Sequence, residues 1–333
     1  MTYDQIIANI KKRNFAQIYF LMGEEPYFID SISNLIEETV LDESEKAFNQ
    51  IIIYGRDVNS ISDVAQQARN FPMMGDHLVV IVKEAQSIDD VEELDKYLDK
   101  IPSTTILVID YKYKKLDKRK ALSKNIEKHG VLFESKRLYD SNIPSWIEQS
   151  LAEEGHKITP KATQMLADFI GNDLHKISNE LQKLIVALPK KVTYDENDVE
   201  YNIGISKDFN IFELQNAIGS RNILKANQIA TYFGDNSKDN PLIVTNIMLY
   251  TYFTKLLKCH YSKDKSSANL AMVIGCSPYF VKDYIVATKN YTIAQCVKAI
   301  EILRQYDMYS KGYGCGTISE KDLYKELIYK LMH

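Results

Sequence analysis

Five short apolar runs within the first 140 residues constrain the fold of this chain more than any other feature. Each run is rich in β-branched and aromatic residues, and none alternates apolar with polar positions. This pattern is typical of strands that are covered on both faces, as in a parallel sheet. An amphipathic helical pattern separates the first two runs, so we expect an α/β domain with helices on both faces of the sheet. The runs are Ile18–Met22, Ile51–Tyr54, Leu78–Val82, Ile106–Ile109 and Val131–Phe133.

Beyond about residue 140 the strand signals stop and apolar residues recur at helical spacing. Four prolines lie at the expected helix starts, and three are preceded by a polar residue suited to cap the helix. The prolines are Pro144, Pro160, Pro241 and Pro278, and the caps are Thr159, Asn240 and Ser277. Because 333 residues exceed what one small core needs, we predict three domains. An α/β domain at 1–140 precedes two all-α domains, at 141–208 and 209–333.

Composition narrows the classes of function. The chain carries 41 basic and 45 acidic residues, a net charge of −4, whereas a dedicated reader of DNA sequence is usually basic. The four cysteines form no C-x-x-C pair and the six histidines are scattered, so neither a metal site nor a cofactor is predicted. No apolar run reaches about 18 residues and Met1–Arg13 has no apolar core. We expect a cytoplasmic protein without a membrane partner.

The first strand runs into Gly23, where an α/β protein that binds nucleotide would carry its phosphate loop. A Walker A loop places a second glycine, a lysine and a hydroxyl at fixed positions. Counted from Gly23, those positions hold Phe28, Ile29 and Asp30. We therefore predict a degenerate loop with no nucleotide-binding residues.

The strand that would carry a Walker B acid ends at Asp110, which Tyr111 follows in place of a glutamate that polarises water. We interpret Asp110 as a strand-end acid that faces solvent or caps a turn. We assign no catalytic residue, because no Ser-His-Asp, Cys-His or paired-carboxylate arrangement is defensible.

Six segments, taken in order along the chain, form a recognisable set. The opening strand leads into Gly-Glu-Glu and an aromatic helix start, and a lysine-rich run follows the fourth strand. The later segments have helical patterns and lie in the expected second and third domains. The segments are Ile18–Phe28, Lys114–Lys120, Asn172–Leu184, Phe212–Ile218, Pro241–Lys258 and Ser277–Val281. In this order they resemble the bacterial DNA polymerase III delta subunits, and the resemblance extends over nearly the whole chain.

The resemblance implies an AAA+-like first domain, a small helical lid and a helical collar. It also implies a clamp-loader subunit that binds and opens the sliding clamp (the beta subunit) for loading onto primed DNA, without hydrolysing ATP itself. Its other implied partners are the delta-prime and gamma or tau subunits, joined through the collars. A DNA-directed DNA polymerase (transferase) label then belongs to the holoenzyme, because this chain has no polymerase carboxylate constellation that we identify.

The element between the second and third strands is a short helical pattern that ends in Phe71, Pro72, Met73 and Met74. Proline does not continue a helix easily, so the apolar residues project at the helix end. In the family, the matching place carries the hydrophobic wedge that enters the clamp. The residues alone also allow a second interpretation, in which this tip packs the helix onto the sheet.

A basic run follows the fourth strand and includes Lys114, Lys115, Lys118 and Arg119. Phosphate contacts require no reading of sequence, so these are candidate DNA-facing residues of a loader that encloses primed DNA. A solvated helix face is the alternative.

Two other functions compete with clamp opening. One is a P-loop-type ATPase, which the residues at positions 28 to 30 disfavour. The other is a helical scaffold subunit of a different complex. Nucleotide binding separates the first alternative from clamp opening, and clamp binding separates the second.

Overall fold

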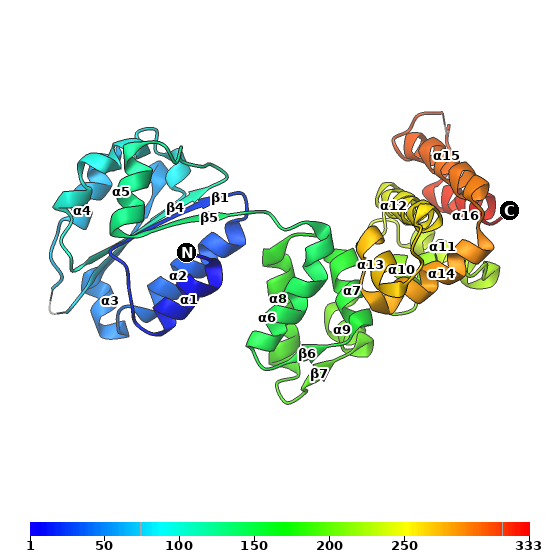
Figure 1. Ribbon diagram of the computed structural model, residues 1–333, viewed down its shortest axis with the longest axis horizontal. Coiled ribbons are helices and arrows are strands. Elements are labelled where there is room, and N and C mark those ends of the chain that lie inside the picture. The colour runs from blue at the N-terminus through cyan, green and yellow to red at the C-terminus, as the bar shows by residue number, and fades with distance from the viewer. Residues whose placement is uncertain (74, 315) are drawn as a thin grey trace. The chain divides into compact units, whose positions relative to one another are not determined.

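The structure is a computed structural model that describes residues 1–73, 75–314 and 316–333. The chain divides into two compact units (Figure 1). The N-terminal unit comprises Met1–Leu138 and the C-terminal unit Tyr139–His333. The N-terminal unit contains two hydrophobic cores and the C-terminal unit a third, so each unit is described by itself.

The N-terminal unit contains a five-stranded sheet whose strand pairs are all parallel, in the order β2-β3-β4-β1-β5. The strands occur where the five apolar runs predict them. Their bounds are β1 Ile18–Gly23, β2 Gln50–Tyr54, β3 Leu78–Lys83, β4 Thr105–Lys112 and β5 Val131–Ser135. The predicted parallel α/β architecture is confirmed.

Helices cover both faces of this sheet. One core joins the sheet to α4 and α5, and a second core joins its other face to α1 and α2 (Figure 1). The bounds are α1 Tyr3–Lys11, α2 Pro26–Thr39, α3 Glu43–Asn49, α4 Ile61–Ala68 and α5 Ala121–His129. Sequence dictates the start of α2: Glu25 caps the helix by accepting from the Tyr27 amide, and Pro26 fills its first position, where no N–H is needed.

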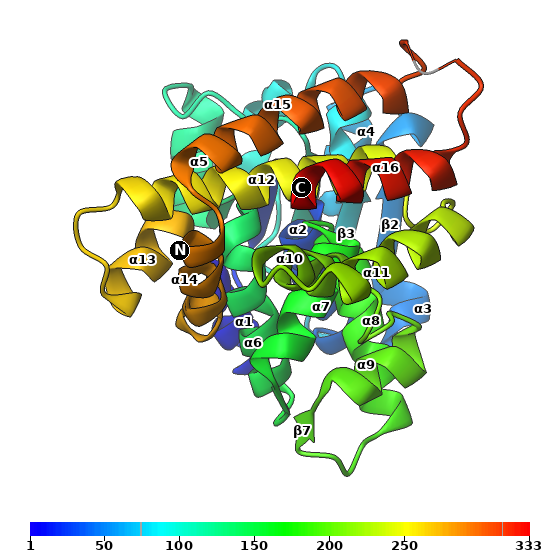
Figure 2. The same cartoon turned by 90° about the vertical axis from the view of Figure 1, so that its right-hand side faces the viewer.

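The C-terminal unit is built of helices, with α12 packed against α15 and α11 against α16 (Figure 2). They are α6 Ile143–Glu153, α7 Pro160–Ile170, α8 Leu174–Ala187, α9 Glu196–Ile203, α10 Ile211–Gly219, α11 Ile223–Asp235, α12 Leu242–Tyr261, α13 Ser267–Ile274, α14 Val281–Asn290, α15 Ile293–Ser310 and α16 Glu320–Met332. The division of this unit into lid and collar remains a prediction.

Three local features differ from the prediction. The outer strands β2 and β5 are less buried than predicted, because each lies at an edge of the sheet: β5 alternates between buried and half-buried positions, and β2 has only half-buried and exposed ones. Asn240 does not cap α12; Pro241 occupies that position, and the Leu242 amide is bound by the Glu320 carboxylate instead. Two-residue strands β6 (Lys157–Ile158) and β7 (Thr193–Tyr194) pair within the helical unit.

Within the described part of the chain, no single helix is both long and apolar enough to cross a membrane. One bent pair, Ser267–Ile274 with Pro278–Asn290, passes the same test of length and composition.

Candidate functional site

The segment between α4 and β3 presents large apolar side chains to solvent. Phe71 is 73% exposed and Met73 63% exposed, with the less exposed Pro72 between them. We call Phe71, Pro72 and Met73 the tip; the predicted fourth member, Met74, lies outside the described residues. These exposures do not fit the alternative in which the two large side chains pack the helix onto the sheet.

The end of α3 holds the backbone of this tip. The side-chain amide of the buried Asn49 donates from Nδ2 to the Met73 carbonyl oxygen at 2.9 Å. Its Oδ1 accepts from the Met73 backbone N–H at 2.6 Å. Met73 is therefore fixed through its backbone while its side chain stays exposed. Phe48, the neighbour of Asn49, is a further exposed apolar residue at this end of α3.

The backbone amides of the loop that follows β1 donate hydrogen bonds to other residues of the same chain. The Gly23 amide donates to the Lys114 carbonyl, and the Glu24 amide donates to the Ser135 carbonyl. The Glu25 amide donates to the Ser135 hydroxyl at 3.2 Å. In a phosphate loop, such amides would point to the ligand. Here the chain itself satisfies these three donors.

Gly23 is required by this close packing. Its φ of +126° lies where side chains are strained, and a Cβ built on it would be 2.1 Å from the Ser135 carbonyl oxygen. The three positions that a Walker A motif needs also serve the fold. Ile29 is fully buried, Phe28 packs beside it, and Asp30 forms an ion pair with Lys112 at 2.5 Å.

Asp110 does not face solvent or cap a turn as interpreted from the sequence. It is fully buried within β4, because the strand continues past it to Lys112. Neither of its carboxyl oxygens has a hydrogen-bond partner among the described residues. Burial raises the pKa of Asp110 to about 7, although the nearby Ser33 hydroxyl and the positive charge of Lys112 oppose the shift.

The side chains of the basic run form hydrogen bonds and ion pairs with other residues of the chain. Lys114 donates to the Gln86 carbonyl at 2.8 Å, Lys115 pairs with Glu24 and Glu134, Lys118 pairs with Glu134 at 2.7 Å, and Arg119 pairs with Asp117 at 2.7 Å. The Arg119 side chain remains 90% exposed. The run thus lies at the surface, and its role toward DNA stays a prediction.

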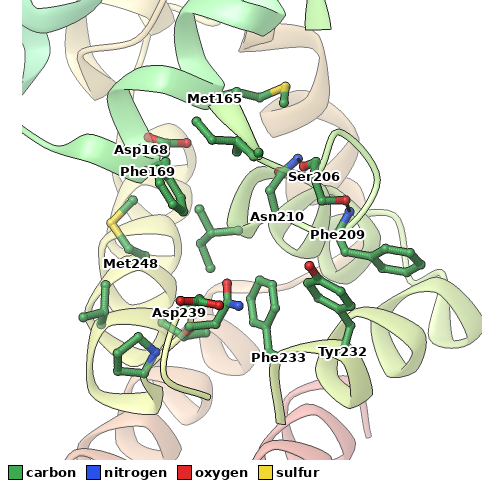
Figure 3. A pocket seen from close by; sticks show the side chains of 17 residues that line it. Met165, Asp168, Phe169, Ser206, Phe209, Asn210, Tyr232, Phe233, Asp239 and Met248 are labelled. Atoms are coloured by element: carbon green, nitrogen blue, oxygen red, sulfur yellow. Dashed lines mark hydrogen bonds between the residues drawn. The ribbon is translucent and has the colours of Figure 1, made fainter. Parts of the chain in front are cut away.

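The C-terminal unit contains a cavity of about 400 Å³ that no sequence pattern indicated (Figure 3). Its wall is formed by α7, the segment before α10 and the facing ends of α11 and α12, and it includes Asp168, Phe169 and Tyr232. Burial raises the pKa of Asp168 to about 6, opposed by a hydrogen bond from Gln164 at 2.7 Å. In the described ranges no cluster of His, Cys, Asp or Glu suits a metal ion.

This architecture, a parallel α/β unit followed by a helical unit, matches that of a solved clamp-loader delta protein. Two family models match the chain: "DNA polymerase III, delta subunit" over residues 19–136, and "DNA polymerase III delta subunit, C-terminal domain" over residues 208–328. The chain belongs to the DNA polymerase III delta subunit family, whose members take part in DNA replication.

Individual relatives agree with the family. The chain is 28% identical over 250 residues to the DNA polymerase III subunit delta of Bacillus subtilis (strain 168), covering 72% of this chain and 71% of that protein. It is 24% identical over 322 residues to a probable DNA polymerase III subunit delta of Aquifex aeolicus (strain VF5), covering 91% and 88%. The solved structure of the Bacillus subtilis DNA clamp loader delta protein (YqeN) matches with a TM-score of 0.57 and 25% identity over 99% of both chains.

Proposed function

We propose that this chain binds a sliding clamp through its tip and opens the ring without hydrolysing ATP. The observation that carries the proposal is the exposure of Phe71 and Met73 on a backbone held by Asn49. A large apolar side chain that is exposed yet fixed in place is suited to enter a partner's pocket. Within the family, the clamp is the partner that such a tip serves.

The energy for opening comes from binding. Full burial of a phenylalanine or methionine side chain contributes roughly 1.5–3 kcal/mol, so two such anchors supply a large part of a modest interface. If the tip binds the open ring more tightly than the closed ring, binding shifts the ring toward the open state by that difference. No covalent step is needed.

The loop after β1 supports an opening mechanism that does not depend on nucleotide bound to this chain. The amides of Gly23, Glu24 and Glu25 are already satisfied by Lys114 and Ser135. A bound phosphate would have to displace those hydrogen bonds and sit beside the Glu24 carboxylate. ATP hydrolysis by the loader is therefore assigned to the gamma or tau subunits.

A stripe of exposed apolar residues on α12 supports association through the collar. Val244, Ile247 and Tyr250 recur at a spacing of three, so they share one face of the helix, and each is about half exposed. We propose the delta-prime and gamma or tau subunits as the partners of the collar. Primed DNA then meets this chain only within the assembled loader, where Lys114, Lys115, Lys118 and Arg119 are candidate phosphate contacts.

The test is binding of the purified chain to the sliding clamp of its own organism, with nucleotide left out. Phe71→Ala and Met73→Ala should each weaken binding about tenfold or more. Phe169→Ala and Met272→Ala are matched controls, because both residues are exposed in the C-terminal unit, and they should bind like wild type. Met74→Ala tests the remaining predicted member.

The outcomes separate the competing functions. Nucleotide-free binding that is lost in the tip variants supports clamp binding by the tip. Wild-type binding in all tip variants moves the contact elsewhere on the chain. A folded chain that does not bind the clamp refutes the proposal and favours the scaffold function. A fluorescence change in the clamp that reports ring opening would complete the test.

A further inference from the structure

The tip is attached to α3 by an unusual contact for a surface loop. Asn49 is the last residue of α3 and is completely buried, although asparagine is ordinarily a surface residue. Its amide makes both a donor and an acceptor hydrogen bond to the same residue, Met73. Two bonds from one rigid planar group fix both the position and the orientation of the Met73 backbone.

A second contact on the other side of position 74 brings the chain against the same helix. A Cβ built on Gly75 would lie 2.7 Å from Glu45 Oε1 and 3.0 Å from Asn49 Nδ2. Glu45 is itself held, because its Oε2 accepts from the Asp42 amide at the start of α3. Gly75 therefore permits the close approach of the loop to α3, and Met73 and Gly75 both lie against one helix.

We propose that Asn49 is a positioning residue for clamp binding: it holds the tip in its binding-competent conformation before the clamp arrives. This inference rests on the proposed function of the tip. Asn49 satisfies the backbone groups of Met73, which leaves the Met73 side chain and the neighbouring Phe71 exposed. Asn49 itself is buried in the free chain.

The expected effect follows from preorganisation. A protein whose competent conformation has a population f binds with an apparent Kd equal to the intrinsic Kd divided by f. Two side-chain hydrogen bonds, each with an ordinary net contribution, change that population by roughly 10- to 30-fold when both are removed. Asn49→Ala should therefore raise the apparent Kd for the clamp by roughly this factor.

Two variants and one control define the experiment on the full chain. Asn49→Ala removes both bonds, whereas Asn49→Asp keeps nearly the same shape but sets a carboxylate against the Met73 carbonyl. The control is Asn246→Ala, because Asn246 is also buried and also donates to a backbone carbonyl, that of Leu303 at 2.9 Å, but in the C-terminal unit. It should lower stability and leave clamp affinity unchanged.

Hydrogen exchange of the free chain measures directly how firmly the backbone of the tip is held. The Met73 amide should be protected in wild type and in Asn246→Ala, and should exchange at least tenfold faster in both Asn49 variants. The amides of β3 should keep their protection, which shows that the N-terminal unit is still folded. If the Met73 amide exchanges faster while clamp affinity stays at the wild-type value, the inference is overturned.

A double-mutant cycle with Phe71→Ala separates positioning from a general loss of stability. If Asn49 acts through the tip, Asn49→Ala should cost less than about threefold in affinity when Phe71 is already absent, so the two effects are not additive. Additive effects refute a positioning role. If Phe71→Ala and Met73→Ala bind normally, the proposed function fails as well; if they lose binding but the Asn49 variants do not, the inference alone fails.

Discussion

Replacing Asp110 by asparagine should stabilise the N-terminal unit, and more strongly as the pH rises. Asp110 is buried within β4, and neither of its carboxyl oxygens meets a hydrogen-bond partner in the described ranges. Burial raises its pKa from the ordinary 3.8 to about 7. The folded chain thus holds the carboxyl as a neutral acid where the unfolded chain ionises it.

The sign and size of the effect follow from proton linkage. Below pH 3.8 both states are protonated and Asp110 carries no penalty. Between pH 3.8 and 7 the unfolded chain binds fewer protons, so the free energy of unfolding falls as the pH rises. One pKa unit corresponds to about 1.4 kcal/mol, so the full penalty above pH 7 is roughly 4 kcal/mol. An asparagine side chain does not titrate, so the stability gained by Asp110→Asn over wild type should grow by roughly 3 kcal/mol from pH 5 to pH 8.

The assay must report the stability of the N-terminal unit separately from that of the C-terminal unit. The only tryptophan of the chain, Trp146, belongs to the C-terminal unit, so its fluorescence serves as an internal control that should not change. Urea-dependent hydrogen exchange of the β4 amides, measured from pH 5 to 8, gives the stability of the unit that contains Asp110. Urea is preferred over guanidinium because the latter screens the neighbouring lysines.

A control of opposite sign and a direct titration make the reasoning refutable. The pKa of Asp117 is lowered by its hydrogen bond with Arg119, so Asp117→Asn should lose stability relative to wild type only as the pH rises to about 3.8, and its difference from wild type should stay constant from pH 5 to 8. A pH-independent difference for Asp110→Asn would contradict the linkage argument. So would a carboxyl resonance of Asp110 that titrates near pH 4 in the folded chain.

Three further predictions concern packing and charge. Gly23→Ala should lower the free energy of unfolding by about 3 kcal/mol, because its Cβ would lie 2.1 Å from the Ser135 carbonyl oxygen. Gly204→Ala should lower it by only about 1 kcal/mol, because Gly204 has a φ of +85° but open space around its Cβ position. Equal losses of the two variants in urea unfolding would refute this reasoning. Phe253→Ala should cost about 3–5 kcal/mol in thermal unfolding, because Phe253 is fully buried. Arg119→Ala should reduce the salt slope of primed-DNA binding by the assembled loader by about one; an unchanged slope would exclude a phosphate contact.

The strands were predictable because their signal is local and strong. In β1 and β3, runs of consecutive apolar residues correspond to strands that are buried on both faces. The same kind of run in β2 gave no sign that this strand is an edge, where Ile52 and Tyr54 are exposed. Strand order depends on which segments pair across the sheet, and that information is not local in the sequence.

The candidate site was only partly predictable for the same reason. The apolar character of Phe71 and Met73 and the break at Pro72 mark a projecting segment from the sequence alone. Asn49 lies 24 positions from Met73 and is one polar residue at the end of an ordinary helix pattern, so nothing in the sequence joins it to the tip. Ser135, which closes the loop at Glu24 and Glu25, is likewise 110 positions from Glu25.

Backbone hydrogen bonding distinguishes the two surfaces that the sequence singled out. The amides of Gly23, Glu24 and Glu25, which a nucleotide phosphate would need, already donate hydrogen bonds within the chain, so that loop offers few free donors to a ligand. At Met73 the chain also fills the backbone donor and acceptor, but a partner needs only the side chains there. In the loop after β1, hydrogen bonding of the backbone within the chain therefore leaves no site for a phosphate. At the tip, the same kind of bonding holds the backbone in place, so less conformational entropy is lost when the apolar side chains bind a partner.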